Sequence, residues 1–325
     1  MAKKYFLGVL TYFKNERSSI YEWILHYKKW GVEHIWMIDN GSEDNYNIEE
    51  FINEGFVTLF KEPLIEQQTA YNKYIPIVQK DVTWICNCDL DEFLYSKEGT
   101  SIKNIIENKV KPSVELISIQ MTIYFPTSFE TPSSIIENNI KRKCYDSNTS
   151  PKCLYNLDKL NKISIHGKNM SSKKFHITAD QTLLCINHYR YISFEILYGI
   201  KEGRGCNPAK FARNIKINRT KIHRTKYKYT SGHKLMTLIE SLDDNFLSDD
   251  TYLRDCSKDV IEKSKLMFME PCIELYPQSS WLYLKNNLKD KYAEFKSYCN
   301  DNRTLTHEQI HEINCFLNGI AKQIL

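Results

Sequence analysis

Apolar and polar residues alternate in blocks along the first 125 residues, and the blocks predict strands and helices in turn. Apolar runs of strand length cover residues 5–13, 34–38, 56–60, 84–88 and 115–125. Between them we expect helices at 48–53, at 102–107, and from about residue 66 to a kink or end near Pro76.

The first helix has the most complete pattern. Ile20, Trp23, Ile24 and Tyr27 follow the i, i+3, i+4, i+7 spacing of one buried helix face. Residues 19–22, Ser-Ile-Tyr-Glu, have the form of a capping box, which predicts that Ser19 and Glu22 close the helix start. Gly31 supplies the residue that commonly ends a helix.

This strand-helix order predicts an α/β fold, with a mostly parallel sheet between flanking helices. In such sheets ligands bind beyond the carboxyl ends of the strands. Short polar side chains follow three of the predicted strands, so we expect one site there, built from Asn15, Glu16, Asp39, Asn40, Asp89 and Asp91.

The remainder of the chain divides by composition. Residues 126–205 mix short strands and loops, and they form the expected second half of the domain after residues 1–125. A basic segment without Asp or Glu opens the helical C-terminal region, 206–325. We interpret residues 208–235 either as a solvated face or as a flap whose cations meet an anionic ligand; binding to nucleic acid is a weaker alternative.

Composition excludes few classes of protein. The 325 residues carry a net charge of +4, which is too small to indicate nucleic acid by itself. The apolar run near the start is too short to span a bilayer and lacks a signal cleavage site, and no later run is long enough, so we expect a soluble cytoplasmic protein. The ten cysteines include no Cys-x-x-Cys pair and are interpreted as free thiols.

The sequence Asp89-Leu90-Asp91 follows a strongly apolar strand. In an extended chain, residues two apart point the same way, so both carboxylates can hold one hard cation such as Mn²⁺ or Mg²⁺. The alternative is a solvated turn, but two unpaired carboxylates at a strand end repel each other. Residues 39–42, Asp-Asn-Gly-Ser, form a turn on composition alone, and Asp39 can also bind a base or a ribose there.

A series of motifs in fixed order adds a family resemblance. It runs through Lys14-Asn15-Glu16, Glu22-Trp23-Ile24, Gly31-Val32, Asp39-Asn40, Ala70-Tyr71-Asn72 and Asp89 to Phe93. In order and spacing this series resembles glycosyltransferase family 92 and its family 2 relatives, over roughly residues 5–205.

The resemblance implies a GT-A fold and a UDP-type nucleotide-sugar donor. It also implies inverting transfer to an acceptor hydroxyl of a glycan or glycoconjugate. By this likeness Asn15, Glu16 and Asp39 line the nucleotide pocket, and Gln68 and Asn72 lie on a helix beside the donor. Asp89 would face the ribose or the metal, and Asp91 the metal.

The later residues of the resemblance supply the remaining candidates. His188, in Asn187-His188-Tyr189, is the preferred third metal ligand, and His166 is the second choice. Ile192 stands where the family usually has a lysine, so the resemblance does not imply a phosphate contact at that position. Each histidine could instead be an ordinary structural residue.

An inverting enzyme needs a carboxylate base near the acceptor hydroxyl. Glu137 matches a family segment on the acceptor side, with Asp146 and Glu130 as competitors. Residues 307–311 spell a zinc-protease pattern, but only 14 residues follow, too few for a third ligand, so we interpret it as coincidence. A nucleotide-sugar-binding protein without catalysis remains the main alternative function.

Overall fold

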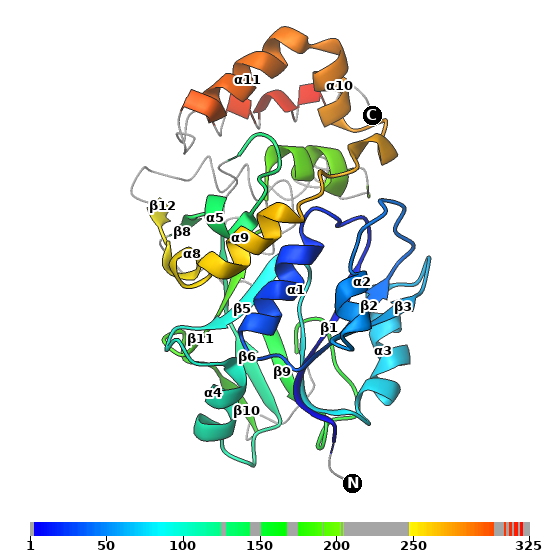
Figure 1. The fold of residues 1–325 in the computed structure, drawn as a ribbon, viewed down its shortest axis with the longest axis vertical. Helices are drawn as coiled ribbons and strands as arrows, with labels where there is room; N and C mark the ends of the chain where they lie inside the picture. Colours follow the sequence, from blue (N-terminus) through cyan, green and yellow to red (C-terminus); the bar gives the residue numbers. More distant parts are fainter. Residues whose placement is uncertain are drawn as a thin grey trace, which may run out of the picture.

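The computed structural model describes residues 3–124, 128–143, 151–167, 175–190, 192–202, 204 and 247–301, with separate residues between 309 and 320. A seven-stranded sheet forms its centre (Figure 1). In spatial order its strands are β10 (His176–Thr178), β6 (Leu116–Ile119), β9 (Lys152–Asn156), β4 (Val82–Asn87), β1 (Tyr5–Phe13), β2 (His34–Asp39) and β3 (Val57–Lys61). Every strand is parallel to its neighbours except β9, which is antiparallel to β4 and β6.

Helices cover both faces of this sheet, which confirms the predicted α/β class. The first half contributes α1 (Ile20–Lys29), α2 (Glu49–Asn53), α3 (Gln67–Val78) and α4 (Ile102–Lys109). Leu7 and Val9 of β1 belong to the core that includes α1, whereas Leu10 belongs to a second core with Tyr71 and Ile75 of α3. Side chains alternate between the faces of a strand, so β1 is buried on both sides, as its continuous apolar sequence predicts.

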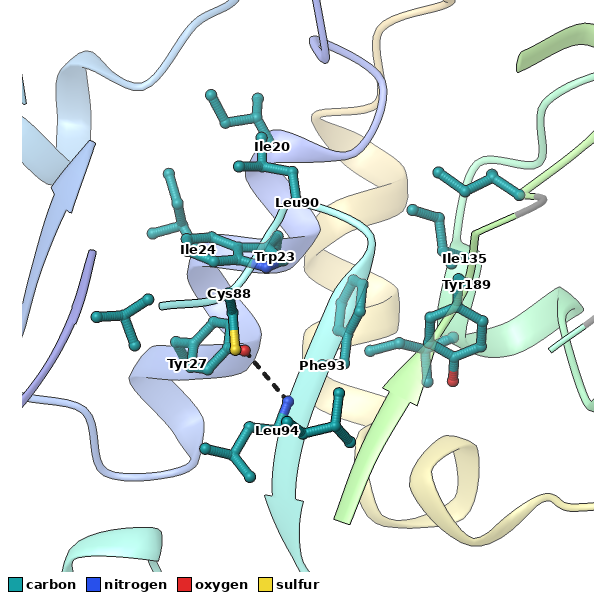
Figure 2. Packing of buried hydrophobic residues seen from close by; sticks show 14 of the residues in the cluster. Ile20, Trp23, Ile24, Tyr27, Cys88, Leu90, Phe93, Leu94, Ile135 and Tyr189 are labelled. Atoms are coloured by element: carbon teal, nitrogen blue, oxygen red, sulfur yellow. Dashed lines mark hydrogen bonds between the residues drawn. The ribbon is translucent and has the colours of Figure 1, made fainter. Parts of the chain in front are cut away.

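Helix α1 has the predicted buried face and the predicted end. Trp23, Ile24 and Tyr27 are fully buried, and the Tyr27 hydroxyl oxygen accepts a hydrogen bond from the Leu94 amide at 3.2 Å (Figure 2). Gly31 follows the helix with φ of 84°, a conformation that glycine adopts without a steric penalty.

The predicted capping box is wrong. The Ser19 side chain makes no capping hydrogen bond; its hydroxyl donates to the Glu16 carbonyl oxygen at 3.1 Å. The Glu22 carboxylate instead accepts from the Ser134 hydroxyl at 2.5 Å and the Ile135 amide at 2.7 Å. The Glu22 side chain therefore accepts hydrogen bonds from residues 134 and 135, far along the chain, and does not cap the start of α1.

A second sheet, of three strands, lies beside the first. It contains β5 (Glu92–Ser96), β11 (Leu184–His188) and β7 (Met121–Ile123), in that order. The predicted single strand over 115–125 is therefore wrong: β6 remains in the central sheet, and after Gln120 the chain changes sheets to pair β7 with β11. Because β6 and β7 are both apolar, the sequence of apolar and polar residues does not indicate that the strand is interrupted between them.

The remaining described elements are short. A two-stranded sheet joins β8 (Lys141–Lys143) to β12 (Leu247–Asp249), and the helices are α5 (Ile135–Asn138), the π-helix η1 (Ile196–Lys201), α8 (Tyr252–Cys256), α9 (Lys258–Leu266), the 3₁₀ turn η3 (Ile273–Leu275), α10 (Ser280–Asn287) and α11 (Lys289–Asp301). Helix α9 packs beside α1, and α10 and α11 lie at the far end of the molecule from the N-terminus (Figure 1). Among the described residues, no helix combines the length and apolar character needed to cross a membrane.

Several predictions fall outside the described residues. They concern the basic segment 208–235, Asp146 and most of the 307–311 pattern. The domain boundaries at 125 and 205 stay predictions; the central sheet takes strands from both sides of residue 125.

Candidate active site

The acidic motif lies in the short loop that joins β4 to β5. Leu90, its middle residue, is buried against α1 (Figure 2). The indole nitrogen of Trp23 donates to the carbonyl oxygens of Asp89 and Glu92, at 2.9 and 3.0 Å. The apolar side chain thus anchors the loop from inside, and the acidic side chains on either side of it are left at the carboxyl edge of the sheet.

The two aspartates of the motif have different partners. Asp89 accepts from the Gln67 amide at 2.9 Å and from the Lys152 ammonium at 3.0 Å. Asp91 accepts from the Lys201 ammonium at 2.6 Å, and its other oxygen lies 3.5 Å from His188 Nε2. Each carboxylate therefore already has a cation of the chain beside it.

Asp91, Glu92 and His188 form a candidate metal cluster. One ligand atom from each lies within 4.8 Å of the others. The register of the second sheet explains this proximity, because His188 stands opposite Glu92 in the antiparallel pair of β11 and β5. His188 Nδ1 is buried and has no hydrogen-bond partner in the described part of the chain. Two carboxylates suit Mn²⁺ or Mg²⁺, and the imidazole favours the transition metal Mn²⁺ of the two, so these residues fit the expected ion.

Glu92 was not among the predicted site residues. The sequence prediction ended the strand before Asp89 and did not include β5, so it gave Glu92 no direction. The apolar run Phe93-Leu94-Tyr95 was the available signal, because a strand beginning there would fix the side on which Glu92 lies.

Lys152 is a fully buried cation within the acidic group. Since β9 runs against its neighbours, its first residue emerges at the edge where the parallel strands end. The Lys152 ammonium lies 3.0 Å from Asp89 Oδ2 and 3.1 Å from Glu92 Oε2. Burial alone would lower the pKa of Lys152, but the two carboxylates outweigh it and raise that pKa well above its usual value. Lys152 therefore stays charged and balances part of the acidic group.

Burial and neighbouring charge act in opposite directions on the cluster itself. Burial disfavours the Asp91 carboxylate, but Lys201 and His188 overcome it and hold the pKa of Asp91 well below its usual range. Burial raises the pKa of Glu92 well above its usual value, against the effect of Lys152. Burial also lowers the pKa of His188, which favours the neutral imidazole that can bind a metal.

Asn15 and Asp39 lie together at the neighbouring strand ends. Their strands β1 and β2 are parallel, and Phe13 pairs with Asp39. Asp39 accepts from the Ser42 amide, the Tyr46 hydroxyl and the Lys61 ammonium, at 2.7, 2.7 and 2.8 Å. These bonds hold the loop that follows β2, and the neighbouring end of β3, against the end of β2.

Asn15 connects this loop to the C-terminal region. It has a φ of 53°; its side-chain oxygen accepts from the Glu43 amide at 2.8 Å, and its Nδ2 donates to the Tyr276 hydroxyl at 2.6 Å. Glu16, the next residue, lies 2.7 Å from the guanidinium of Arg204. The predicted nucleotide-pocket residues are thus grouped, and both Asn15 and Glu16 have partners from much later in the sequence.

The two glutamines at the start of helix α3 make different contacts. Gln67 reaches Asp89, whereas Gln68 holds the loop after β9: it donates to the Ile163 carbonyl at 2.9 Å and accepts from the Ile165 amide at 3.2 Å. Gln68 also donates to Asn72 at 3.1 Å. His166 follows this loop and is not a member of the candidate metal cluster of the described residues.

The predicted bases lie in the region between the second sheet and the C-terminal helices. Glu137 of α5 is 38% exposed and forms an ion pair with Lys265 of α9 at 2.5 Å. Glu130 accepts from the Tyr292 hydroxyl at 2.6 Å and from Lys296 at 2.8 Å. Both carboxylates therefore have partners among residues of the C-terminal helices.

Comparison with known proteins gives a family match. The sequence profile described as glycosyltransferase family 92 matches residues 8–241. A glycosyltransferase family 92 protein of Oryza sativa subsp. japonica is 23% identical over 215 residues, which are 62% of this chain and 36% of that protein. One of Ricinus communis is 21% identical over 207 residues, 60% of this chain and 37% of that protein. The chain thus spans little more than a third of the length of these relatives.

Solved structures give weaker likenesses. TarS of S. aureus, residues 1–349, has a TM-score of 0.39 at 13% identity, covering 81% of this chain and 90% of that one. Glucosyl-3-phosphoglycerate synthase of Mycobacterium tuberculosis, in complex with Mn²⁺, UDP and glucosyl-3-phosphoglycerate, has a TM-score of 0.30 at 11% identity, covering 48% and 58%.

Proposed function

Because the chain belongs to glycosyltransferase family 92, we propose that it transfers a sugar from a UDP-type nucleotide sugar to a hydroxyl of a glycan or glycoconjugate, with inversion. The observation that carries this proposal is the cluster of Asp91, Glu92 and His188 at the carboxyl edge of the sheet. In an α/β fold that edge is where ligands bind.

The cluster has the ligands for one divalent cation. Asp91 and His188 would hold Mn²⁺ or Mg²⁺, as the sequence suggested, and Glu92 would be the third ligand. Such an ion supplies positive charge to stabilise the departing diphosphate. Lys152 would hold Glu92 and Asp89 in place through ion pairs of 3.1 and 3.0 Å.

The nucleotide would lie along the ends of β1, β2 and β4. Asn15, Glu16 and Asp39 border this stretch, and Asp89 stands between it and the cluster. Asn15 and Asp39 are buried and hydrogen-bonded, so they would shape the pocket chiefly by fixing the loop of residues 40–46. Gln68 and Asn72, on α3, would border the same pocket.

We propose Glu137 as the base that removes the acceptor proton while the acceptor oxygen attacks the anomeric carbon. Helix α5, which carries it, is held to α1 by the bonds between Glu22 and the start of α5. The same helix α1 holds the acidic loop through Trp23. The base and the metal cluster are thus tied to one rigid element.

A two-stage experiment tests the proposal. First, thermal unfolding is followed with nucleoside diphosphates, with and without Mn²⁺; a ligand that binds only the folded state raises the melting temperature, and we expect the largest rise for UDP with Mn²⁺. Second, UDP-sugars are screened for release of UDP. No nucleotide-dependent rise would contradict a nucleotide-sugar site, and binding without any turnover would favour the non-catalytic alternative.

A further inference from the structure

Lys201 reaches the metal cluster from a rigid position. It ends the π-helix η1, and π-helical turns often occur at functional sites. Gly199, two residues earlier, packs so closely that a Cβ there would lie 2.2 Å from Ile273 Cγ2. Glu202, the next residue, accepts from the Ser280 amide at 3.1 Å and the Ser280 hydroxyl at 2.9 Å, at the start of α10. The C-terminal region thus fixes the backbone on both sides of Lys201.

The Lys201 ammonium and the metal cluster share one carboxylate. Lys201 Nζ lies 2.6 Å from Asp91 Oδ2 and 2.6 Å from the Arg190 carbonyl oxygen. The other oxygen of Asp91 faces His188 at 3.5 Å. The side chains of Lys201 and Asp91 are each only 13% exposed, so water screens this pair little.

Two cations at one carboxylate repel each other unless a further anion is present. Metal–oxygen distances are close to 2 Å, so an ion bound to Asp91 would lie within about 5 Å of the Lys201 ammonium. At that distance and with little exposure, the repulsion would weaken metal binding substantially. A diphosphate beside both cations would supply the missing negative charge.

We propose that Lys201 makes the metal ion and the nucleoside diphosphate bind cooperatively. Without donor, Lys201 pairs with Asp91 and weakens binding of the metal ion. With donor, the diphosphate oxygens pair with both cations, so each ligand strengthens binding of the other. This inference rests on the proposed function, and it adds the order of assembly of the site.

The experiment measures Mn²⁺ affinity by calorimetry, with and without saturating UDP. The proteins are wild type, Lys201→Met, Lys201→Gln and Lys201→Arg, with Lys263→Met as a control that removes a lysine pairing with Glu50 elsewhere on the molecule. For wild type we expect UDP to tighten Mn²⁺ binding by at least about fivefold. In Lys201→Met and Lys201→Gln, Mn²⁺ alone should bind at least about fivefold more tightly than in wild type, and UDP should increase the Mn²⁺ affinity less. Lys201→Arg and the control Lys263→Met should behave as wild type.

Different results overturn different claims. If wild type shows the cooperativity but both neutral variants keep it, the role of Lys201 is wrong and the proposed function stands. The role is also wrong if Lys201→Arg behaves as the neutral variants do, because charge would then not be the cause. If no protein binds Mn²⁺ with or without UDP, the metal site and this inference both fail. In Lys201→Gln the side-chain amide can still donate to the Arg190 carbonyl oxygen, so this variant tests the proposal if Lys201→Met does not fold.

Discussion

The indole nitrogen of Trp23 donates a hydrogen bond of 2.9 Å to the carbonyl oxygen of Asp89, and so ties the first helix to the loop that carries the acidic motif. The same nitrogen lies 3.0 Å from the Glu92 carbonyl oxygen, at the far end of that loop. One side chain therefore spans the loop and fixes the distance between its ends. Because Asp91 lies within this span, the direction of its carboxylate depends on a helix that bears no metal ligand.

Replacing Trp23 with phenylalanine tests this dependence. The ring is kept in part but two carbonyl oxygens lose their donor, so we expect a loss of about 1–3 kcal/mol in the free energy of unfolding. As a support of the metal ligands, Trp23 should also affect Mn²⁺ affinity, which we expect to fall about 10- to 100-fold. Urea unfolding and Mn²⁺ titration measure the two effects.

Trp281→Phe is the matched control. Trp281 is fully buried, and its indole nitrogen has no hydrogen-bond partner among the described residues. That variant loses ring volume without losing a hydrogen bond, so its Mn²⁺ affinity should stay that of wild type. Equal losses of Mn²⁺ affinity in both variants would mean that Trp23 acts only through general packing.

The two aspartates of the motif should differ in their effect on metal binding. Asp91 belongs to the candidate cluster, so Asp91→Asn should reduce Mn²⁺ affinity by more than about 100-fold. Asp89 contacts Gln67 and Lys152, so Asp89→Asn should act as a change to a supporting residue, about 10- to 100-fold. Calorimetry on the two variants in parallel measures this. The reverse order would make Asp89 the main ligand and would contradict the cluster of Asp91, Glu92 and His188.

Glu22 should give the folding stability a distinct pH dependence. Burial raises its pKa from 4.5 to about 7, against the hydrogen bonds from Ser134 and Ile135. Between those pH values the folded protein binds more protons than the unfolded chain, so the free energy of unfolding falls as pH rises. At 1.36 kcal/mol per pKa unit, the loss amounts to roughly 3 kcal/mol and is complete above pH 7.

The variant Glu22→Gln removes the titrating group and keeps one acceptor oxygen. Urea unfolding at steps between pH 4.5 and 7.5 should show that the difference from wild type changes along this range, in favour of the variant as pH rises. Glu54→Gln, a change at an ion pair on the surface, should leave the wild-type slope in place. A constant difference between Glu22→Gln and wild type would show that folding does not raise the pKa of Glu22.

The assignment of Glu137 as the base predicts a selective defect. Glu137→Gln keeps the shape of the side chain but cannot accept a proton, so transfer to the acceptor should fall about 100- to 10,000-fold. Binding of UDP and Mn²⁺ should be unchanged, because Glu137 lies outside the metal cluster. Transfer kinetics measure the loss of rate, and a nucleotide titration checks that binding of UDP and Mn²⁺ is unchanged. Lys265→Met, which removes the ion-pair partner of Glu137, should keep much more activity; equal losses would indicate a structural role for the pair.

The sequence predicted the parts of the site that depend on local order. The spacing of apolar residues in α1 is a property of a short segment, and so is the position of polar residues directly after β1, β2 and β4. These local patterns were enough to predict that Asn15, Asp39 and Asp89 lie at one edge of the sheet. Partners from distant parts of the chain have no such signal. Lys201 meets Asp91 across 110 residues, and the cap formed by Glu22 joins residues 112 apart.

The same reason explains why the sequence of the acidic motif indicates a single pair of metal-binding carboxylates. Two carboxylates two residues apart do share a side in an isolated strand. Here Lys152, 63 residues away from Asp89, provides a competing cation that a local pattern cannot reveal. The strand direction of β9 decides this contact, and direction follows from the order of the whole sheet.

Lys152 is the most deeply buried cation among the described residues of the site, so the fold should depend strongly on its charge. Lys152→Met has a similar length but leaves Asp89 and Glu92 without their shared partner. Removing one member of a buried ion pair costs about 3–5 kcal/mol, and we expect a loss of that size at pH 7 in urea unfolding. Lys28→Met, which breaks an exposed pair with Glu54, should cost no more than about 1 kcal/mol.

Mn²⁺ should then distinguish loss of charge from loss of packing. A divalent cation can replace the missing positive charge beside Glu92, so Mn²⁺ should raise the melting temperature of Lys152→Met by more than it raises that of wild type. If the variant is strongly destabilised and Mn²⁺ does not restore it, the loss comes from how the methionine packs in the site and not from the missing charge. If the variant is no less stable than Lys28→Met, the buried ion pairs of Lys152 do not stabilise the fold.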